Sequence, residues 1–188
     1  TENNPNKDTN KTAYSYIFNE QEKALKEAFE NFKKLDNTEL KSKFKEYKEK
    51  NKFWLEKDSL YEALIIENGN DYWPMWESET DKCLFNPQND EQKVQYEKRI
   101  EELKEKYADV IEYYSFCQFV ISVQNEKTRE YAQSRGLKMI ADRQVAFSDR
   151  DNWAYQAYFL KGWCLGCPPD YFSEDGQAWG FPVMDPEK

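Results

Sequence analysis

The chain has 188 residues, the length of one ordinary domain, which is enough to bury a substantial core. Hydrophobic residues make up 39% and charged residues 34%, but aromatic residues reach 16%, which excludes global disorder. The net charge of −9 argues against nucleic acid and anionic membrane as partners, because both bind clustered Lys and Arg. Histidine is absent, which excludes Ser-His-Asp and Cys-His catalysis and any zinc site built on histidine.

The N-terminal residues 1–12 are polar and lack the apolar core of a signal peptide. We expect them to form a disordered lead. Nowhere does the sequence contain the run of about 18 apolar residues that a membrane span requires. These observations predict a cytoplasmic protein whose cysteines are free thiols.

Two helices are predicted in the first quarter of the chain. Apolar residues recur at helical spacing over residues 13–34, and Glu and Lys occupy the opposite face. Asp36, Asn37 and Thr38 are typical turn and cap residues, so a second helix is expected at 39–50. Its apolar residues are sparse, which predicts that this helix lies on the surface.

A third helix is predicted over residues 60–67. Asp58 and Ser59 favour a cap before it, and Gly69 favours an end after it. It is apolar nearly all round, so it should be buried. Residues 71–76 cannot continue the helix through Pro74 and are expected to form an aromatic loop or a short extended piece, followed by a polar connection at 77–90.

The longest periodic stretch begins after Asn89 and Asp90 and ends at Gly136, which predicts one long helix. Its first part is solvated on one face, whereas residues 110–123 are apolar on most sides and should enter a core. The apolar seam steps by three and four residues: Ile100, Leu103, Tyr107, Val110, Tyr114, Cys117 and Ile121.

Residues 137–141 are predicted to form a short buried strand that ends at Asp142. A helix that leads through a glycine into a buried strand is typical of α/β folds. Asp142, Asp149 and Asp151 then lie where a parallel barrel places its active groups, and paired carboxylates serve glycoside chemistry. Turn formation and helix capping are the alternative roles for these three residues.

Cys164 and Cys167 form a CxxC pair, which could join Cys83 and Cys117 in a four-thiolate zinc site. A second CxxC is missing, however, and Cys117 lies on an apolar helix face where a core role is simpler. A redox CxxC pair sits at a helix N-terminus, whereas two prolines follow this pair, which argues against a redox role. We therefore expect no metal and no cofactor.

After a short helix predicted at 149–158, the stretch Gly162–Pro182 holds four of the six glycines and three of the seven prolines. It has no periodicity, yet it is rich in aromatic rings, which predicts an ordered loop that contacts a ligand. Burial of the rings beneath the loop is the alternative. The candidate ligand-contacting residues are Asp170, Tyr171, Phe172, Gln177 and Trp179.

Residues 167–182 read Cys-Pro-Pro-Asp-Tyr-Phe-Ser-Glu-Asp-Gly-Gln-Ala-Trp-Gly-Phe-Pro. This segment resembles the substrate-covering loop of the 4-α-glucanotransferases (amylomaltase, glycoside hydrolase family 77), and every fixed position of their pattern matches from Pro168 to Pro182. Residues 145–153, Val-Ala-Phe-Ser-Asp-Arg-Asp-Asn-Trp, are similar to the family's Val-Ala-Tyr-Asp-Ser-Ala-Asp-Val-Trp. Before this segment, around Asp142, the chain is about two residues shorter than the family's Gly-Asp-Leu-Pro-Ile.

The resemblance implies an α/β, predominantly helical fold that is part of a (β/α)8 TIM barrel with a helical insertion. Residues 13–109 would form the insertion and 110–188 a partial barrel segment, with the loop 162–182 covering substrate. Asp151 and Trp153 would line the donor side, and the loop residues Asp170, Tyr171, Phe172, Gln177 and Trp179 would bind α-1,4-glucan or maltooligosaccharide.

The family's nucleophile and acid/base segments, Arg-x-Asp-His and Ala-Glu-Asp-Leu-Gly, do not occur in this sequence. The resemblance thus implies an internal fragment of a retaining transferase, inactive alone, with the rest of the barrel as a partner. Two alternatives remain: a stand-alone glucan-binding protein without catalysis, and a helical interaction module that dimerises through the Ile100–Ile121 seam.

Overall fold

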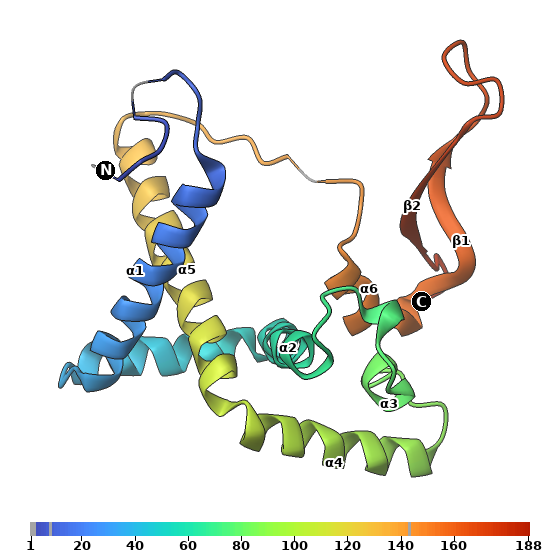
Figure 1. Ribbon diagram of the computed structural model, residues 1–188, viewed down its shortest axis with the longest axis horizontal. Coiled ribbons are helices and arrows are strands. Elements are labelled where there is room, and N and C mark those ends of the chain that lie inside the picture. Colours follow the sequence, from blue (N-terminus) through green and yellow to red (C-terminus); the bar gives the residue numbers. More distant parts are fainter. Residues whose placement is uncertain (1–2, 8, 143) are drawn as a thin grey trace.

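The computed structural model describes residues 3–7, 9–142 and 144–188, so part of the predicted lead, residues 1, 2 and 8, lies outside the described residues. Most of the described chain is helical, and a β-hairpin stands at its C-terminal end (Figure 1). In chain order the elements are α1 (Tyr14–Lys34), α2 (Thr38–Asn68), the 3-10 turn η1 (Trp73–Met75), α3 (Glu79–Lys82), α4 (Asp90–Lys106), α5 (Ala108–Ser134), α6 (Asp149–Ala154), the 3-10 turn η2 (Gln156–Tyr158), β1 (Phe159–Cys167) and β2 (Gln177–Met184).

The first core lies between α1, α2 and α5, and it is built from stacked phenylalanines. Phe32 and Phe44 meet edge to face with ring centroids 5.3 Å apart, a geometry that aromatic pairs prefer. Most residues of 39–50 are exposed, as expected for a surface helix, and Phe44, at 4% exposure, is the residue that it buries in this core. The buried members of the cluster are Phe29, Phe32, Phe44, Phe116 and Phe119.

The second core lies between the C-terminal half of α2, helix α4 and helix α6. Leu60 and Leu64 of α2 are fully buried there, which confirms that the predicted helix 60–67 enters a core. Gly69 ends α2 with φ +63°, as the sequence predicts. The buried members of the cluster are Leu60, Tyr61, Leu64, Trp76, Leu84, Tyr96, Leu103, Trp153 and Ala154.

Helix α2 is continuous over 31 residues, so the predicted break between 50 and 60 is wrong. Asp58 and Ser59 are cap formers in isolation, but here both lie inside the helix. The Ser59 hydroxyl donates to the Glu56 carbonyl at 3.1 Å, and the Asp58 carboxylate accepts from the Tyr114 hydroxyl at 3.2 Å. Ser59 thus bonds locally to its own helix and Asp58 bonds to α5, so neither side chain caps a helix here.

The predicted long helix is divided into α4 and α5, which meet at an angle (Figure 1). Tyr107 leaves the helical conformation at the junction, with φ −115° and ψ 28°, and its hydroxyl donates to the Glu67 carboxylate of α2. The seam residue Leu103 is buried in the second core and Ile100 and Tyr107 pack against it, so this part of the seam is used inside the fold. Beyond the bend the seam residue Tyr114 contacts Asp58 and Arg150, whereas Ile121 is exposed.

The predicted buried strand at 137–141 is wrong for this structure. The segment has no strand hydrogen bonds, and Leu137, Met139 and Ile140 are exposed. A parallel strand is formed only by hydrogen bonds to neighbouring strands, and within the described residues no strand lies beside it. The segment instead crosses from the end of α5 to α6 as an extended connection (Figure 1).

The stretch 162–182 is largely a β-hairpin, which corrects the prediction of an aperiodic loop. Strands β1 and β2 pair antiparallel, with Phe159 opposite Met184 and Cys167 opposite Gln177. Two irregularities along the ladder disturb the alternation of side chains, which explains why no period-2 pattern is visible in the sequence. Gly166 allows the strands to approach, because a Cβ there would lie 2.1 Å from the Gln177 carbonyl oxygen.

Candidate functional site

Helix α6 carries Asp151 and begins with a capping box. The Ser148 hydroxyl accepts a hydrogen bond from the Asp151 amide at 3.1 Å, and the Asp151 carboxylate accepts from the Ser148 amide at 3.2 Å. The Ser148 hydroxyl also donates to this carboxylate at 2.7 Å. Asp151 therefore both caps the helix and leaves its carboxylate at a half-exposed position.

Trp153 fixes α6 to the body of the protein. Its side chain is 1% exposed, and its indole N–H donates to the Asp81 carbonyl at 2.8 Å. The ring packs against Tyr61 and Phe85, with centroids 5.2 Å away in both cases. In this structure Trp153 has no face open to a ligand.

Arg150, which the sequence reading did not single out, holds α6 against α2 and α5. Its guanidinium pairs with Glu62, donates to the Tyr114 hydroxyl at 2.8 Å, and lies over the rings of Tyr61 and Tyr114. Burial raises the pKa of the neighbouring Asp58 carboxyl, an effect that the Arg150 charge opposes. Only the fold reveals this network, because its members lie far apart in the sequence.

The tip of the hairpin presents two aromatic rings to solvent. Tyr171 is 95% exposed and Phe172 is 88% exposed, and the rings meet edge to face at 5.4 Å. The Asp170 carboxylate accepts from the amides of Phe172 at 2.9 Å and Ser173 at 2.8 Å. Asp170 thus braces the turn that carries the rings, and no apolar contact buries them.

Gln177 and Trp179 stand on β2, below the tip. The Trp179 indole N–H donates to the Gln177 side-chain oxygen at 3.0 Å, which orients both groups. Trp179, Phe181 and Leu165 also line an apolar hollow of about 410 Å³ between the hairpin and residues 144–146. A ring with an open face beside an apolar hollow can hold the apolar side of a ligand.

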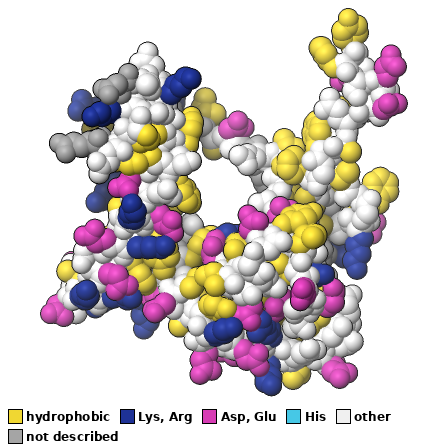
Figure 2. Space-filling view, in the orientation of Figure 1, with side chains coloured by type: hydrophobic (Ala, Val, Ile, Leu, Met, Phe, Trp, Pro, Cys, Tyr) yellow, Lys and Arg dark blue, Asp and Glu magenta, His cyan; other side chains and the backbone are white. Residues whose placement is uncertain are grey.

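Apart from Gln177 and Trp179 on β2, the predicted site residues fall into two groups. Asp151 and Trp153 lie on α6 at the base of the hairpin, whereas Asp170, Tyr171 and Phe172 lie at its far end (Figure 1). A strand rises about 3.3 Å per residue, so the nine residues of β1 separate the two groups by roughly 25–30 Å. Figure 2 shows the tip as a projecting arm that carries apolar and acidic side chains.

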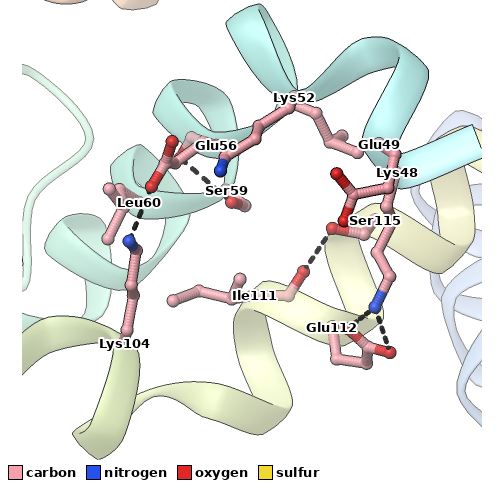
Figure 3. Close-up of a pocket in the computed structure, with 11 residues that line it drawn as sticks. Lys48, Glu49, Lys52, Glu56, Ser59, Leu60, Lys104, Ile111, Glu112 and Ser115 are labelled. Carbon is pink, nitrogen blue, oxygen red and sulfur yellow. Dashed lines mark hydrogen bonds and ion pairs between the residues drawn. The ribbon is translucent and has the colours of Figure 1, made fainter. Parts of the chain in front are cut away.

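A separate cleft of about 300 Å³ lies between α2, α4 and α5 and contains none of the predicted site residues (Figure 3). Lys48 pairs with Glu112 at 2.7 Å and Lys104 pairs with Glu56 at 2.6 Å. These ion pairs join the helices across the cleft, which is consistent with a structural role.

The four cysteines are free thiols placed on different parts of the fold, with Cys83 after α3, Cys117 on α5, and Cys164 and Cys167 on β1. Across residues 3–7, 9–142 and 144–188 there is no group of three or more His, Cys, Asp or Glu that could hold a metal ion. Among the same residues, no helix combines the length and apolar character that crossing a membrane demands.

Comparison with known proteins places the chain in a family. The family model described as 4-alpha-glucanotransferase, glycoside hydrolase family 77, matches residues 1–188. The chain belongs to the 4-alpha-glucanotransferase family. The match covers the helical region as well as the hairpin, so membership does not depend on the tip motif alone.

Individual relatives show how similar the sequences are and how much of each protein the match covers. The 4-alpha-glucanotransferases of Clostridium butyricum and Thermus thermophilus are each 30% identical to the chain, over 92% and 85% of its length. The chain spans about a third of each relative, 34% and 31% respectively. The structure of the Streptococcus agalactiae amylomaltase in complex with acarbose matches the fold with a TM-score of 0.75, at 22% identity, covering 93% of this chain and 34% of that protein.

Proposed function

We propose that the chain binds α-1,4-glucan or maltooligosaccharide as part of a 4-α-glucanotransferase. The observation that carries the proposal is the braced hairpin tip, where the rings of Tyr171 and Phe172 are exposed without an apolar neighbour that would explain them. Exposed rings on an ordered support can stack on the apolar face of a sugar. Family membership and the acarbose complex of the Streptococcus agalactiae relative support this ligand class.

The other candidate residues take supporting roles in this proposal. Gln177 and Trp179 hold the glucan below the tip, and the Asp151 carboxylate accepts hydrogen bonds from sugar hydroxyls at the base. Trp153 acts indirectly, because it is buried and fixes the helix that carries Asp151.

The transfer reaction itself would be a retaining double displacement, in which one carboxylate forms a glycosyl ester and a second serves as acid and then as base. The family segments that supply these two carboxylates do not occur in the sequence, so the chain contributes binding residues and no catalytic residue. In this proposal Leu137–Ala141 becomes a barrel strand when neighbouring strands are supplied. Its exposed apolar side chains support that role.

The proposal is tested by titrating the purified chain with maltotriose in a calorimeter, followed by incubation and analysis of the products. We expect saturable binding without release of glucose or longer maltooligosaccharides. Formation of those products would show that the chain carries its own catalytic residues. Absence of heat at millimolar sugar would contradict the binding role.

The second candidate function is glucan binding by a stand-alone protein. The same exposed tip supports it, because binding there needs no catalytic residue. The two functions are separated by adding a polypeptide that carries the family's nucleophile and acid/base segments. Transferase activity that depends on both components supports the first function, whereas unchanged binding without any activity supports the second.

A further inference from the structure

A second cavity lies on another part of the hairpin, between its base, helix α6 and the turns η1 and η2. Its volume is about 300 Å³, at the lower end of the range typical of ligand sites. It shares no lining residue with the 410 Å³ hollow beside Trp179. The lining side chains that bear on its chemistry are Trp73, Asn152, Gln156, Lys161 and Trp163.

Trp163 offers an open aromatic face at this cavity. Its side chain is 70% exposed, although it belongs to a strand and lies beside a hollow. A single exposed indole is ordinary at a protein surface, but one that borders a cavity can stack on the apolar face of a ligand held there. Trp73 contributes a second ring to the wall, but its indole N–H is buried without a hydrogen-bond partner and is not open to a ligand in this conformation.

Two of the three polar side chains at the cavity, Asn152 and Lys161, are uncommitted. Within the described part of the chain, the Asn152 amide makes no side-chain hydrogen bond, and Lys161 forms no ion pair. Gln156 is already engaged, since its amide donates to the Lys82 carbonyl at 2.5 Å. No carboxylate among the described residues lines the cavity, and its two indoles and two amides suit a neutral ligand with an apolar face and hydroxyl groups.

We propose that this cavity is a second saccharide site, which holds one sugar unit of an α-glucan with its apolar face on Trp163. The Asn152 amide and the Lys161 ammonium hydrogen-bond to the sugar hydroxyls. The ligand class rests on the proposed function, whereas the location rests on the cavity and its uncommitted groups. The site lies on the face of the hairpin base toward η1, remote from the tip.

The experiment follows the six tryptophan indole N–H signals of the ¹⁵N-labelled chain by NMR, with the Trp163 and Trp179 signals assigned through Trp→Phe variants. During a maltotriose titration, we expect both signals to shift and saturate at different sugar concentrations. A shift at Trp179 alone overturns the second site and leaves the proposed function standing. A shift at Trp163 alone supports the second site and counts against the glucan contact proposed for Trp179. Absence of both shifts overturns both.

Variants at the cavity test the assigned contacts. Asn152→Ala should weaken the affinity reported by Trp163 about two- to tenfold, the usual effect of losing one neutral hydrogen bond, and leave the Trp179 titration unchanged. Asn125→Ala, the same change at an exposed residue of α5 that does not line the cavity, is the matched control and should not change either titration. An unchanged Trp163 titration in Asn152→Ala contradicts the assignment. Saturation of the Trp163 signal by inorganic phosphate instead of maltotriose would identify an anion site and overturn the proposal.

Discussion

At the scale of single residues, the tip of the hairpin is stabilised by hydrogen bonds and its base by packing in the core. Tyr171 and Phe172 have no packing partner except each other, so their positions depend on the hydrogen bonds of Asp170. Trp153 is held by the core on every side. Substitutions at the tip should therefore affect binding, and substitutions at Trp153 should affect stability.

The first prediction concerns Tyr171→Ala and Phe172→Ala. Each should weaken maltotriose binding about tenfold, or about 1.4 kcal/mol, because each removes an apolar surface that the sugar covers. The unfolding temperature should stay within error, since exposed side chains contribute little to stability. Calorimetric titration and thermal unfolding measure the two quantities. Phe18→Ala, an exposed ring on α1, is the control, and an equal loss of affinity there would contradict the assignment.

The second prediction concerns Trp153→Ala, which removes the largest anchor of α6. The free energy of unfolding should fall by about 3–5 kcal/mol, the usual cost of truncating a buried large aromatic residue. Urea unfolding followed by circular dichroism measures the change. Trp163→Ala, at an exposed tryptophan, should lower the free energy of unfolding much less. Equal losses of stability at both positions would contradict the claim that Trp153 anchors α6.

The third prediction concerns the acid side of the stability profile. Hydrogen bonds from Lys106 and Tyr107 lower the pKa of Glu67 to about 2 from its ordinary value of 4.5. A lowered carboxyl pKa stabilises the fold fully above the ordinary value and loses that contribution as the pH falls toward 2. Glu67→Gln should flatten the decline in unfolding free energy between pH 4.5 and 2. Glu91→Gln, on the exposed first turn of α4, should leave the decline unchanged.

At the scale of elements, local patterns predicted helices well where one face meets a core. The helix predicted at 13–34 is found at Tyr14–Lys34, and the cap predicted near Asn37 is present, with its side chain accepting from the Leu40 amide. The errors in the helices concerned their boundaries: the break predicted between 50 and 60 is absent, and the bend at Tyr107 was not predicted. The sequence could not show that Tyr107 would reach Glu67, because that contact links residues 40 positions apart.

The fourth prediction concerns the turn of the hairpin. Gly176 has φ +73°, and a Cβ there would lie 2.6 Å from the Cys167 carbonyl oxygen. Gly176→Ala should therefore disorder the tip and raise amide hydrogen exchange at residues 170–177, with weaker maltotriose binding as a consequence. Gly180→Ala has a similar φ of +75° but open space around the added carbon, so its effect should be smaller. Equal effects of the two substitutions would show that the positive φ, and not the close approach to Cys167, causes the disorder of the tip.

At the scale of the whole molecule, the described chain has two cores and one extended connection between α5 and α6. The connection carries apolar side chains that the described chain leaves in water, with Ile140 96% exposed. A barrel strand at this position requires neighbours, and the chain spans only about a third of its relatives. The predicted barrel therefore remains a proposal, whereas the predominantly helical character is confirmed.

The fifth prediction follows from that exposure. Ile140→Lys should change the unfolding free energy of the 188-residue chain by less than about 0.5 kcal/mol, as expected for a surface position. In a longer polypeptide that also supplies the neighbouring strands, the same substitution should cost several kcal/mol, because it buries an unpaired charge. Urea unfolding of both proteins measures the difference. A small effect in both would contradict the barrel strand.

The helical periodicity, several caps, the family motif and the residues of the tip can be read from the amino-acid order, because they depend on neighbours along the chain. The continuity of α2, the burial of Trp153 and the contacts of Arg150 with Glu62 and Tyr114 become visible in the folded chain alone. It also showed a hairpin where a loop was predicted. These features depend on contacts between distant residues, which outweigh local preference once apolar surface is buried.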